Sequence, residues 1–283
     1  MDQKLIFFLF LFLIVLVLIY QSRGIKRIYK QEVVQGLNRI KRSENLIVTE
    51  NDSRHLPEPV QKYLAYVGVY GKEKIQNVRI TFEGEMKMDP QKDWLKIKTQ
   101  QYNFFDESPT RMFLIQAKMF GLPIVGLDSY KNGKGNMLIK LASLFTVADA
   151  KGPEMDISET VTLFNDMCLM APATLIDKRI QWETVDAWTA KGTFNDNGCK
   201  VSALLYFNTR GELTNFITDD RYYTTVGQSY QRVRWSTPVR DYAEINGVKL
   251  PTYGEGVWHL AAGDYPYARF NVKEVEYNCW NFK

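Results

Sequence analysis

The sequence predicts an α+β fold that is mainly β: a strongly curved antiparallel sheet, or half-barrel, with one or two helices against its concave face and a transmembrane helix at its N-terminus. Three observations predict it. Apolar residues alternate with a period of two through most of the chain after residue 77. Glycine-containing turns separate these short segments, and only two stretches after residue 55 show helical spacing. Periodicity does not separate an open sheet from a closed barrel or a two-sheet sandwich, so both alternatives stay open.

The first element is an apolar run at the N-terminus. Residues 5–20, LIFFLFLFLIVLVLIY, carry no charge, and as a helix they span about 24 Å at roughly 1.5 Å per residue. The flanks lack the basic start and the small-residue cleavage site of a signal peptide, and no cysteine follows that would carry a lipoprotein anchor. Residues 1–22 are therefore predicted to be an uncleaved transmembrane anchor that contacts the lipid bilayer through residues 5–20.

Charge around this run predicts the side of the membrane. One lysine precedes the run, whereas four basic residues follow it within ten positions: Arg23, Lys26, Arg27 and Lys30. The positive-inside rule places this side in the cytoplasm. Three cysteines without CxxC spacing agree with free thiols in a reducing compartment. We therefore expect a single-pass membrane protein with a cytoplasmic soluble domain, and an extracytoplasmic domain is the alternative.

The rest of the chain divides into a stalk and one domain. Residues 23–55 are basic, helical in propensity and poor in large apolar residues, which predicts a juxtamembrane stalk. Residues 56–283 are predicted to form a single curved-sheet domain. It begins with a short amphipathic helix in LPEPVQKYLAYVGV, residues 56–69, which Gly68 ends.

Strands follow this helix. The first lies in NVRITFEGEMKM, where Val78, Ile80 and Phe82 alternate with polar residues. Turns such as Asn132-Gly133 separate the later segments and favour hairpins. Further strands are predicted at residues 93–105, 111–120, 124–133, 135–142, 187–194, 199–208, 213–223, 230–238, 240–247, 252–261 and 267–278.

A second helix is predicted to start within GPEMDISET, residues 152–160. Asp156 followed by Glu159 fits an N-cap residue and its reciprocal partner, and the apolar residues that follow share one helical face. The helix is expected to end near Met170, because Pro172 disfavours helical geometry in the residue before it.

Two further carboxylates of this region, Asp149 and Glu154, are candidate ligand-binding residues. They lie in the segment that leads into the helix, and capping does not explain them. Loop carboxylates of this kind can coordinate a cation or accept hydrogen bonds from an arginine. The alternative is that they form hydrogen bonds that shape the loop.

Four other candidates come from the strand region. Arg221 and Tyr222 lie in DDRYY, where an arginine beside tyrosines suits the polar group of a pocket. Trp258 and His259 are neighbours in the strand GVWHLAA, so alternation places them on opposite faces. His259 is a candidate general base, but a lone strand histidine without a Ser or Cys nucleophile elbow is more often a polar structural residue.

Aromatic residues make up 13% of the chain and recur across the strands. A curved sheet lined with such side chains could hold a lipid or another apolar ligand. The alternative is a solid core in which large side chains fill the concavity. The aromatic residues concerned are Trp94, Tyr102, Phe104, Phe105, Phe113, Phe120, Trp182, Trp188, Tyr222, Tyr223, Trp235, Trp258, Tyr265 and Tyr267.

Composition excludes some classes of function and leaves others open. The 36 basic residues nearly balance the 32 acidic ones, which gives no indication of nucleic acid. We find no calcium loop, zinc motif, Walker loop or dinucleotide fingerprint, so no metal and no cofactor is predicted. The sequence favours a membrane-anchored, non-enzymatic domain that binds a lipid, another apolar ligand or a membrane partner. The alternative is a hydrolase or metal-dependent enzyme that uses the acidic segment 149–159.

Several segments together resemble an uncharacterised family of bacterial membrane-anchored domains of unknown function. They are LPEPVQKYL, GLPIVGLDSY, VADAKGPEMDISE, APATLID, DDRYY and the C-terminal stretch from INGVKLPTYGEG to VEYN, and they span nearly all of residues 56–278. Where such families commonly have an aromatic residue before the mid-chain proline, this chain has LMAPATL. The C-terminal stretch is also similar, more weakly, to the end of bacterial lipoprotein-carrier domains. That similarity implies a helix-covered half-barrel with an apolar cavity, and it implies no catalytic residue.

Overall fold

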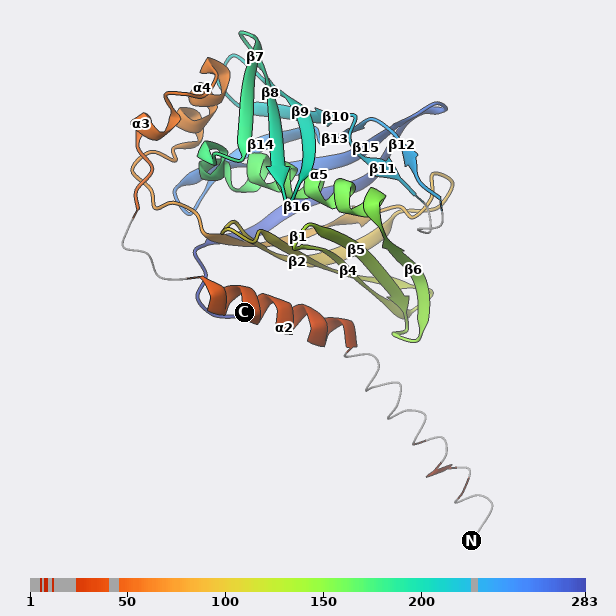
Figure 1. Cartoon of the computed structure of the whole chain (residues 1–283). Helices are drawn as coiled ribbons and strands as arrows, with labels where there is room; N and C mark the ends of the chain where they lie inside the picture. The colour runs from red at the N-terminus through yellow and green to blue at the C-terminus, as the bar shows by residue number, and fades with distance from the viewer. Residues whose placement is uncertain (1–5, 7, 10–11, 13–23, 41–45, 225–228) are drawn as a thin grey trace.

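Fourteen strands of the described chain form one continuous antiparallel sheet that curls into a half-barrel (Figure 1). The computed structural model describes residues 6, 8–9, 12, 24–40, 46–224 and 229–283. The sheet order is β6-β5-β4-β3-β2-β1-β16-β15-β13-β10-β9-β8-β7, and β14 pairs with β15. Because β6 and β7 are the two ends of this order, the sheet is open, which confirms the prediction of a curved sheet over a closed barrel.

The strands have the following bounds: β1 (Asn77–Met86), β2 (Leu95–Phe104), β3 (Thr110–Met119), β4 (Leu122–Lys131), β5 (Lys134–Leu141), β6 (Phe145–Lys151), β7 (Ile180–Asp186), β8 (Thr189–Asp196), β9 (Cys199–Phe207), β10 (Leu213–Thr218), β13 (Trp235–Ser236), β14 (Val239–Ile245), β15 (Val248–Leu260) and β16 (Gly263–Tyr277). A separate pair joins β11 (Tyr222–Tyr223) to β12 (Gln231–Arg232). Most predicted strands are present. The predicted strand 213–223 is divided into β10 and β11, and β6 and β7 were not predicted.

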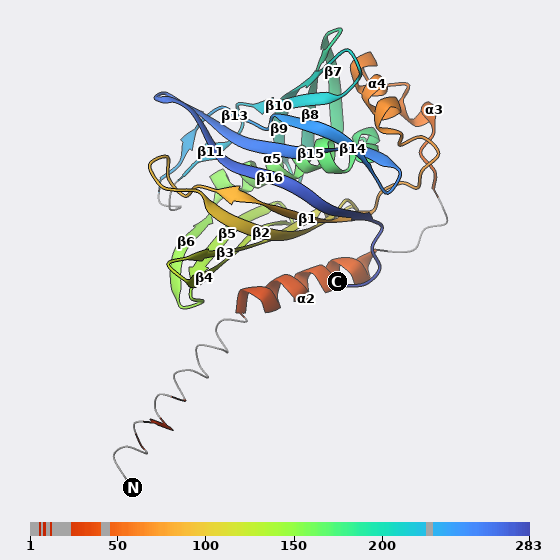
Figure 2. The same cartoon turned by 180° about the vertical axis from the view of Figure 1, so that it is seen from behind.

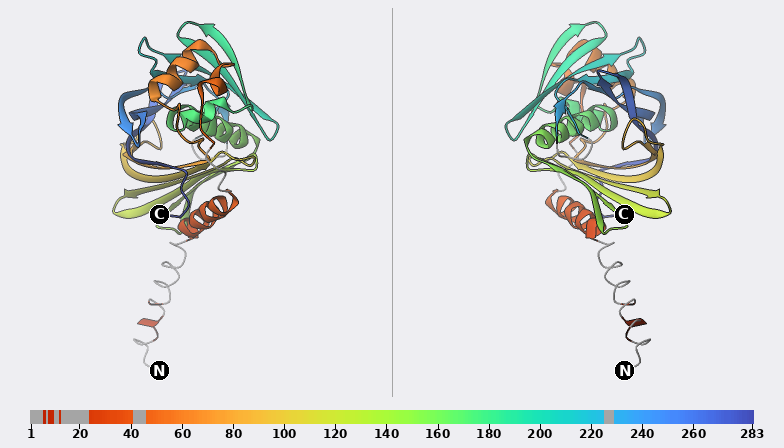
Figure 3. Two further views of the ribbon diagram at one scale, coloured as in Figure 1. Left: turned by 90° about the vertical axis from the view of Figure 1, so that its left-hand side faces the viewer. Right: turned by 90° about the vertical axis from the view of Figure 1, so that its right-hand side faces the viewer.

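Helix α5 (Pro153–Met170) lies against the concave face of the sheet. Figure 3 shows it, in green, enclosed between the two arms of the curled sheet. The helix ends where predicted, because Ala171 leaves helical geometry ahead of Pro172, which begins the 3-10 helix η1 (Pro172–Ile176). The short helices α3 (Glu50–Ser53) and α4 (Glu58–Val67) lie at one end of the half-barrel (Figure 1). Gly68, in the left-handed conformation, ends α4 as predicted.

Helix α2 (Gly24–Arg39) covers the convex face, beneath β2, β3 and β4 (Figure 2). This helix lies within the segment that was predicted as a stalk. Its residues Ile25, Tyr29, Val33 and Leu37 are four positions apart, share one face and are buried against the sheet together with Phe104. The spacing is visible in the sequence, but the many basic residues between these positions obscure it.

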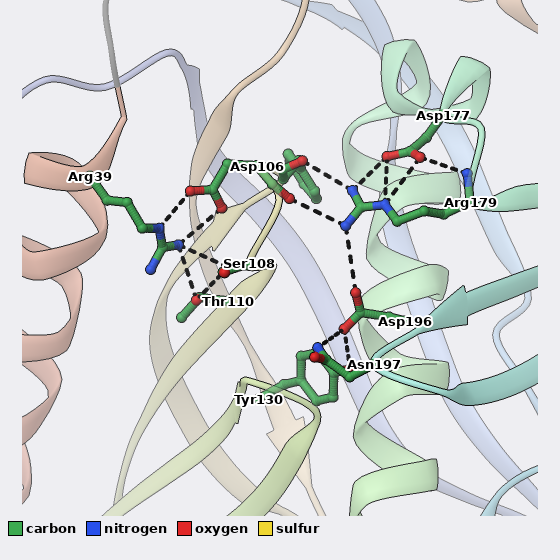
Figure 4. Close-up of polar contacts among 10 residues, drawn as sticks. Arg39, Asp106, Ser108, Thr110, Tyr130, Asp177, Arg179, Asp196 and Asn197 are labelled. Atoms are coloured by element: carbon green, nitrogen blue, oxygen red, sulfur yellow. Dashed lines mark hydrogen bonds and ion pairs between the residues drawn. The ribbon is translucent and has the colours of Figure 1, made fainter.

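Arg39, the last residue of α2, fastens the helix to the sheet (Figure 4). Its Nε is 2.5 Å from the carboxylate of Asp106, and its Nη2 donates to Asp106, to the main-chain oxygen of Ser108 and to Thr110. Because all three acceptors lie at or beside the β2–β3 turn, α2 is joined to the domain by polar contacts as well as by its apolar face.

A second polar network closes one end of the half-barrel (Figure 4). Arg179, just before β7, donates to the main-chain oxygens of Phe105 and Asp106 and lies 3.5 Å from the carboxylate of Asp196 at the end of β8. Tyr130, near the end of β4, donates to the same Asp196 carboxylate at 2.5 Å. These bonds join the two arms of the sheet at this end. At the opposite end of β4 from Tyr130, the tips of the β3–β4 and β5–β6 hairpins expose Phe120, Leu122 and Phe145.

The predicted transmembrane anchor falls almost entirely outside the described residues. Of the run 5–20, only residues 6, 8–9 and 12 are described. Among the residues that are described, we find no helix with the length and apolar character needed to cross a membrane.

Candidate functional site

A cavity of about 310 Å³ lies between α5 and the concave face of the sheet. This volume is at the lower end of the range of roughly 300–1,000 Å³ that ligand pockets occupy. Most of its wall is apolar. Three phenylalanine rings from β1, β3 and β16 contact one another on this wall with centroids 5.4–6.4 Å apart: Phe82, Phe113 and Phe270.

Small residues also line the cavity. They are Ala117 on β3, Gly126 on β4 and Ala148 on β6. Beyond them, Met86, Met88 and Leu95 extend the apolar wall toward the end of the sheet where the hairpin tips are exposed. We call this part the apolar end of the cavity.

Buried charged residues form the opposite part of the wall, which we call the polar end. At its centre Arg111 on β3 contacts three carboxylates. Its Nη1 lies 2.7 Å from Asp128 on β4 and 3.2 Å from Glu159 on α5. Its Nε lies 2.8 Å from Asp166, about two helical turns further along α5. Gln101 also donates to Asp166, at 2.6 Å. Charged side chains from strand and helix thus hold α5 against the sheet.

The protonation of this cluster follows from its burial. Burial opposes the charge on Arg111, but the carboxylates of Asp128, Asp166 and Glu159 outweigh it and raise the pKa of the guanidinium, so Arg111 is charged. Burial, followed by the charge of Asp128, raises the pKa of Glu159 to about 8, although Arg111 and Arg221 act in the opposite direction. Glu159 is therefore mostly protonated at neutral pH.

A second arginine, Arg221, lies at the same end of the cavity between two tryptophan rings. Its guanidinium is 4.1 Å from the ring centroid of Trp235 and 5.4 Å from that of Trp258, which are distances for favourable cation–π contacts. Its Nη2 is 3.8 Å from Glu159, too far for a hydrogen bond. The next residue, Tyr222, donates its main-chain N–H to Ser158 of α5 at 3.0 Å and so holds this segment against the helix.

A family model described as a family of unknown function, DUF6544, matches residues 46–270. The chain belongs to the DUF6544 family. The match begins after α2 and includes the whole cavity wall except Val272. The predicted resemblance to a family of unknown function is thereby confirmed, whereas the match says nothing of a membrane anchor. No curated protein matches this DUF6544 chain.

Several solved structures are similar to the DUF6544 chain. Among them are a putative outer membrane lipoprotein-sorting protein domain from Vibrio parahaemolyticus (10% identity, 78% of this chain and 91% of that chain, TM-score 0.41), a DUF1329 family protein from Desulfovibrio piger (10%, 78% and 92%, 0.43) and a LolA superfamily protein from Nitrosomonas europaea (11%, 78% and 94%, 0.40). Lipoprotein-carrier proteins, to which the C-terminal stretch was compared, are thus among the matches.

The structure brings three of the six predicted site residues of the DUF6544 domain to the cavity. Arg221, Tyr222 and Trp258 line it, whereas Asp149, Glu154 and His259 do not. Asp149 lies on the edge strand β6, exposed and 3.1 Å from Lys151, because it alternates with cavity-lining alanines on either side. Glu154 is half-buried in the first turn of α5.

His259 lies on the face of β15 opposite Trp258, as alternation predicted. Its Nε2 is 2.9 Å from Ser236 and its Nδ1 is 2.7 Å from Asp264, so both ring nitrogens have partners outside the cavity. The acidic segment 149–159 therefore does not converge with His259 in one cleft, which is the arrangement that the enzyme alternative requires. Within the described ranges, no three His, Cys, Asp or Glu side chains are placed to hold a metal ion.

The prediction that Asp156 caps α5 with Glu159 as its reciprocal partner is wrong. The N-cap residue is Gly152, without a side-chain cap, and Pro153 begins the helix four residues earlier than a cap at Asp156 would allow. Asp156 instead accepts from the main-chain N–H of Gly135 at 2.8 Å and pairs with Lys134. Glu159 does not cap the helix and belongs to the buried cluster around Arg111.

Sequence analysis missed Arg111, Asp128 and Asp166. A signal for the first two was present: Arg111 lies in phase with Phe113 on β3, and Asp128 lies in phase with Gly126 on β4, so each charge shares the apolar face of its strand. A charge on the buried face of a strand requires a buried partner. Asp166 offers no such signal, because its partner is 55 residues away in the sequence.

Proposed function

We propose that this protein is a membrane-anchored, non-enzymatic domain that holds one apolar or amphiphilic ligand of lipid-like character in the cavity under α5. The observation that carries the proposal is the cavity itself. It offers about 310 Å³ against a wall that is mostly apolar and is partly open to solvent, which is the size and lining of a small-molecule pocket. Water forms few hydrogen bonds with an apolar wall, whereas an alkyl chain that enters the cavity removes its apolar surface from water, which is favourable.

The exposed hairpin tips support an exchange of ligand at a membrane surface. Phe120 is 94% exposed, and Leu122 and Phe145 beside it are also exposed. They lie at or beside the β3–β4 and β5–β6 turns, and these turns are on the side of the domain where α2 begins at Gly24 (Figures 1 and 2). We propose that residues 5–20 anchor the chain in the bilayer, with the domain on the cytoplasmic side that the basic residues favour.

Native mass spectrometry of the full chain tests this proposal. The full chain is needed because α2 packs on the sheet and a fragment beginning at residue 50 would uncover that face. The chain, extracted in a neutral maltoside detergent that is then removed in the gas phase, should retain a bound molecule of a few hundred daltons. Ala117→Trp, which adds a large side chain to the wall of the cavity, should lose it.

Lys118→Trp is the matched control, because Lys118 is the next residue on β3 and its side chain is exposed. This variant should retain the bound molecule. The proposal would be overturned if the wild-type chain carried nothing, or if Ala117→Trp and Lys118→Trp retained the molecule equally.

A further inference from the structure

Arg221 has hydrogen-bonding groups that no described residue uses. The residue is only 9% exposed, and among the described residues its Nε and Nη1 have no hydrogen-bond partner. A buried polar group without a partner costs roughly 1–3 kcal/mol, and more when it is charged. Such a group on the wall of a cavity indicates that something else supplies the partner.

Arg111, at the same end of the cavity, is an arginine whose guanidinium does have hydrogen-bond partners. Arg111 donates to three carboxylates, so both sides of its planar fork are occupied. The nearest carboxylate to Arg221 is Glu159, and it lies beyond hydrogen-bonding distance at 3.8 Å. Arg221 is instead held by its tryptophan neighbours, which orient the guanidinium but accept no conventional hydrogen bond from it.

A third unused donor lies beside Arg221. The indole Nε1 of Trp235, whose ring is under the guanidinium, is buried and has no partner among the described residues. The unused groups of these two residues are therefore all donors. Of the carboxylates around them, Asp128 and Asp166 pair with Arg111, and among the described residues only the Oδ1 of Asp128 is left without a partner there. Three buried donor atoms of Arg221 and Trp235 are thus available to a ligand at the polar end.

We propose that the ligand is an alkyl chain with an acidic headgroup, a carboxylate or a phosphate monoester, whose oxygens are bound by Arg221 and Trp235 at the polar end of the cavity. This inference rests on the proposed function, since it assumes that the cavity holds a ligand. Both headgroups present two or more oxygens to a planar guanidinium, which is the geometry that arginine binds bidentately. The alkyl chain then lies toward Met86 and Leu95 at the apolar end.

Matched probes with one alkyl chain and different headgroups test the proposal. The full chain in nanodiscs of phosphatidylcholine is incubated with palmitate, 1-palmitoyl lysophosphatidate, hexadecanol or 1-palmitoyl glycerol, and the bound fraction is measured by native mass spectrometry. Wild type and variants are in the same bilayer, so each probe partitions into the lipid equally in every sample. Differences between wild type and variants therefore report binding to the protein. Wild type should bind at least one acidic probe ten times more tightly than the neutral probe of the same chain.

Arg221→Met keeps the apolar bulk of the side chain and removes the charge. It should lose this tenfold preference while its affinity for hexadecanol stays within about twofold of the wild-type value, which also shows that the variant is folded. Arg221→Lys keeps the charge without the planar fork and should give an intermediate preference. Arg234→Met is the control, because Arg234 is exposed, pairs with Asp219 and does not line the cavity, and it should bind all four probes as wild type does.

The outcomes separate the inference from the proposed function. Tighter binding of palmitate alone supports a free fatty acid, and tighter binding of lysophosphatidate alone supports a phosphate headgroup. Equal affinity of wild type for acidic and neutral probes overturns the headgroup inference and leaves the apolar cavity standing. Binding of none of the four probes overturns the proposed function itself.

Discussion

The two faces of the same sheet are each covered by a helix, but they are packed differently. On the convex face, α2 packs so closely that a Cβ on Gly36 would come within 2.5 Å of the Phe104 ring. Tyr102 stacks on Phe104 and on Phe282 from the C-terminal segment, with centroids 6.4 and 6.1 Å apart. On the concave face, α5 leaves a cavity of about 310 Å³.

The difference lies in where the small residues are. On the convex face the glycine is on the helix, so the helix approaches the aromatic surface of the sheet. On the concave face Ala117, Gly126 and Ala148 are on the sheet, while the ion pairs of Arg111 fix the distance of α5. Both features that the aromatic content suggested, a solid core and a ligand cavity, are present on the concave face: Phe164 of α5 packs in the main core with Phe194 and Phe216, and the cavity lies beside this core.

Removing the charge that fixes α5 should have the largest effect. Arg111→Met leaves the buried carboxylates of Asp128 and Asp166 without their partner, and breaking a buried ion pair in this way costs about 3–5 kcal/mol. We expect this loss in the free energy of unfolding by urea. Arg234→Met, which breaks an exposed pair, should cost less than about 1 kcal/mol. Equal losses in the two variants would mean that the buried cluster does not hold the helix.

A truncation on the convex face should cost stability without changing the ligand. Tyr29 lies on the buried face of α2, with its hydroxyl donating to Gln100. Tyr29→Ala should destabilise the protein by about 3 kcal/mol, the usual cost of an aromatic truncation in a core. The bound molecule seen by native mass spectrometry should be unchanged. Its loss from a folded Tyr29→Ala variant would contradict the separation of the two faces.

Two glycine substitutions compare the packing of the faces directly. Gly36→Ala places a methyl group against the buried Phe104 ring, and overpacking of this kind costs about 1–3 kcal/mol. Gly126→Ala on the concave face meets its nearest neighbour, Ile139, at 3.4 Å and should change the free energy of unfolding by less than about 1 kcal/mol. Thermal or urea denaturation measures both. A larger cost for Gly126→Ala would reverse the comparison.

A further effect is expected on the pH dependence of stability. The folded protein holds a proton on Glu159 up to about pH 8, whereas the unfolded chain releases it near the ordinary pKa of about 4.3. Because the unfolded state binds fewer protons in this window, stability should fall as the pH rises from about 5 to 8. Glu159→Gln should remove this part of the slope in melting temperature. Glu183→Gln, on the exposed part of β7, should retain it, and a slope that is the same in all three proteins would contradict the assignment.

The sequence allowed the general fold to be predicted, because alternation along strands and the residues that end helices act locally. Gly68 and Pro172 end their helices as expected. The sequence did not allow the position of α2 to be predicted, because the apolar residues of this helix have a surface to pack against only when the sheet has formed. The prediction of site residues was also limited to what local sequence shows. Arg221 and Trp258 were found by composition, whereas Arg111 depends on partners brought together by the fold.

The central claim is that an alkyl ligand lies on the concave face and not on the convex one. Photolabelling the full chain in native membranes with a diazirine analogue of palmitate, followed by mapping of the labelled peptides, tests it most directly. The account predicts labels on cavity strands, at residues such as Met86 on β1 and Met137 on β5, and their loss in Ala117→Trp. Labelling confined to residues 5–20, or equal labelling of α2 on the convex face, would contradict it.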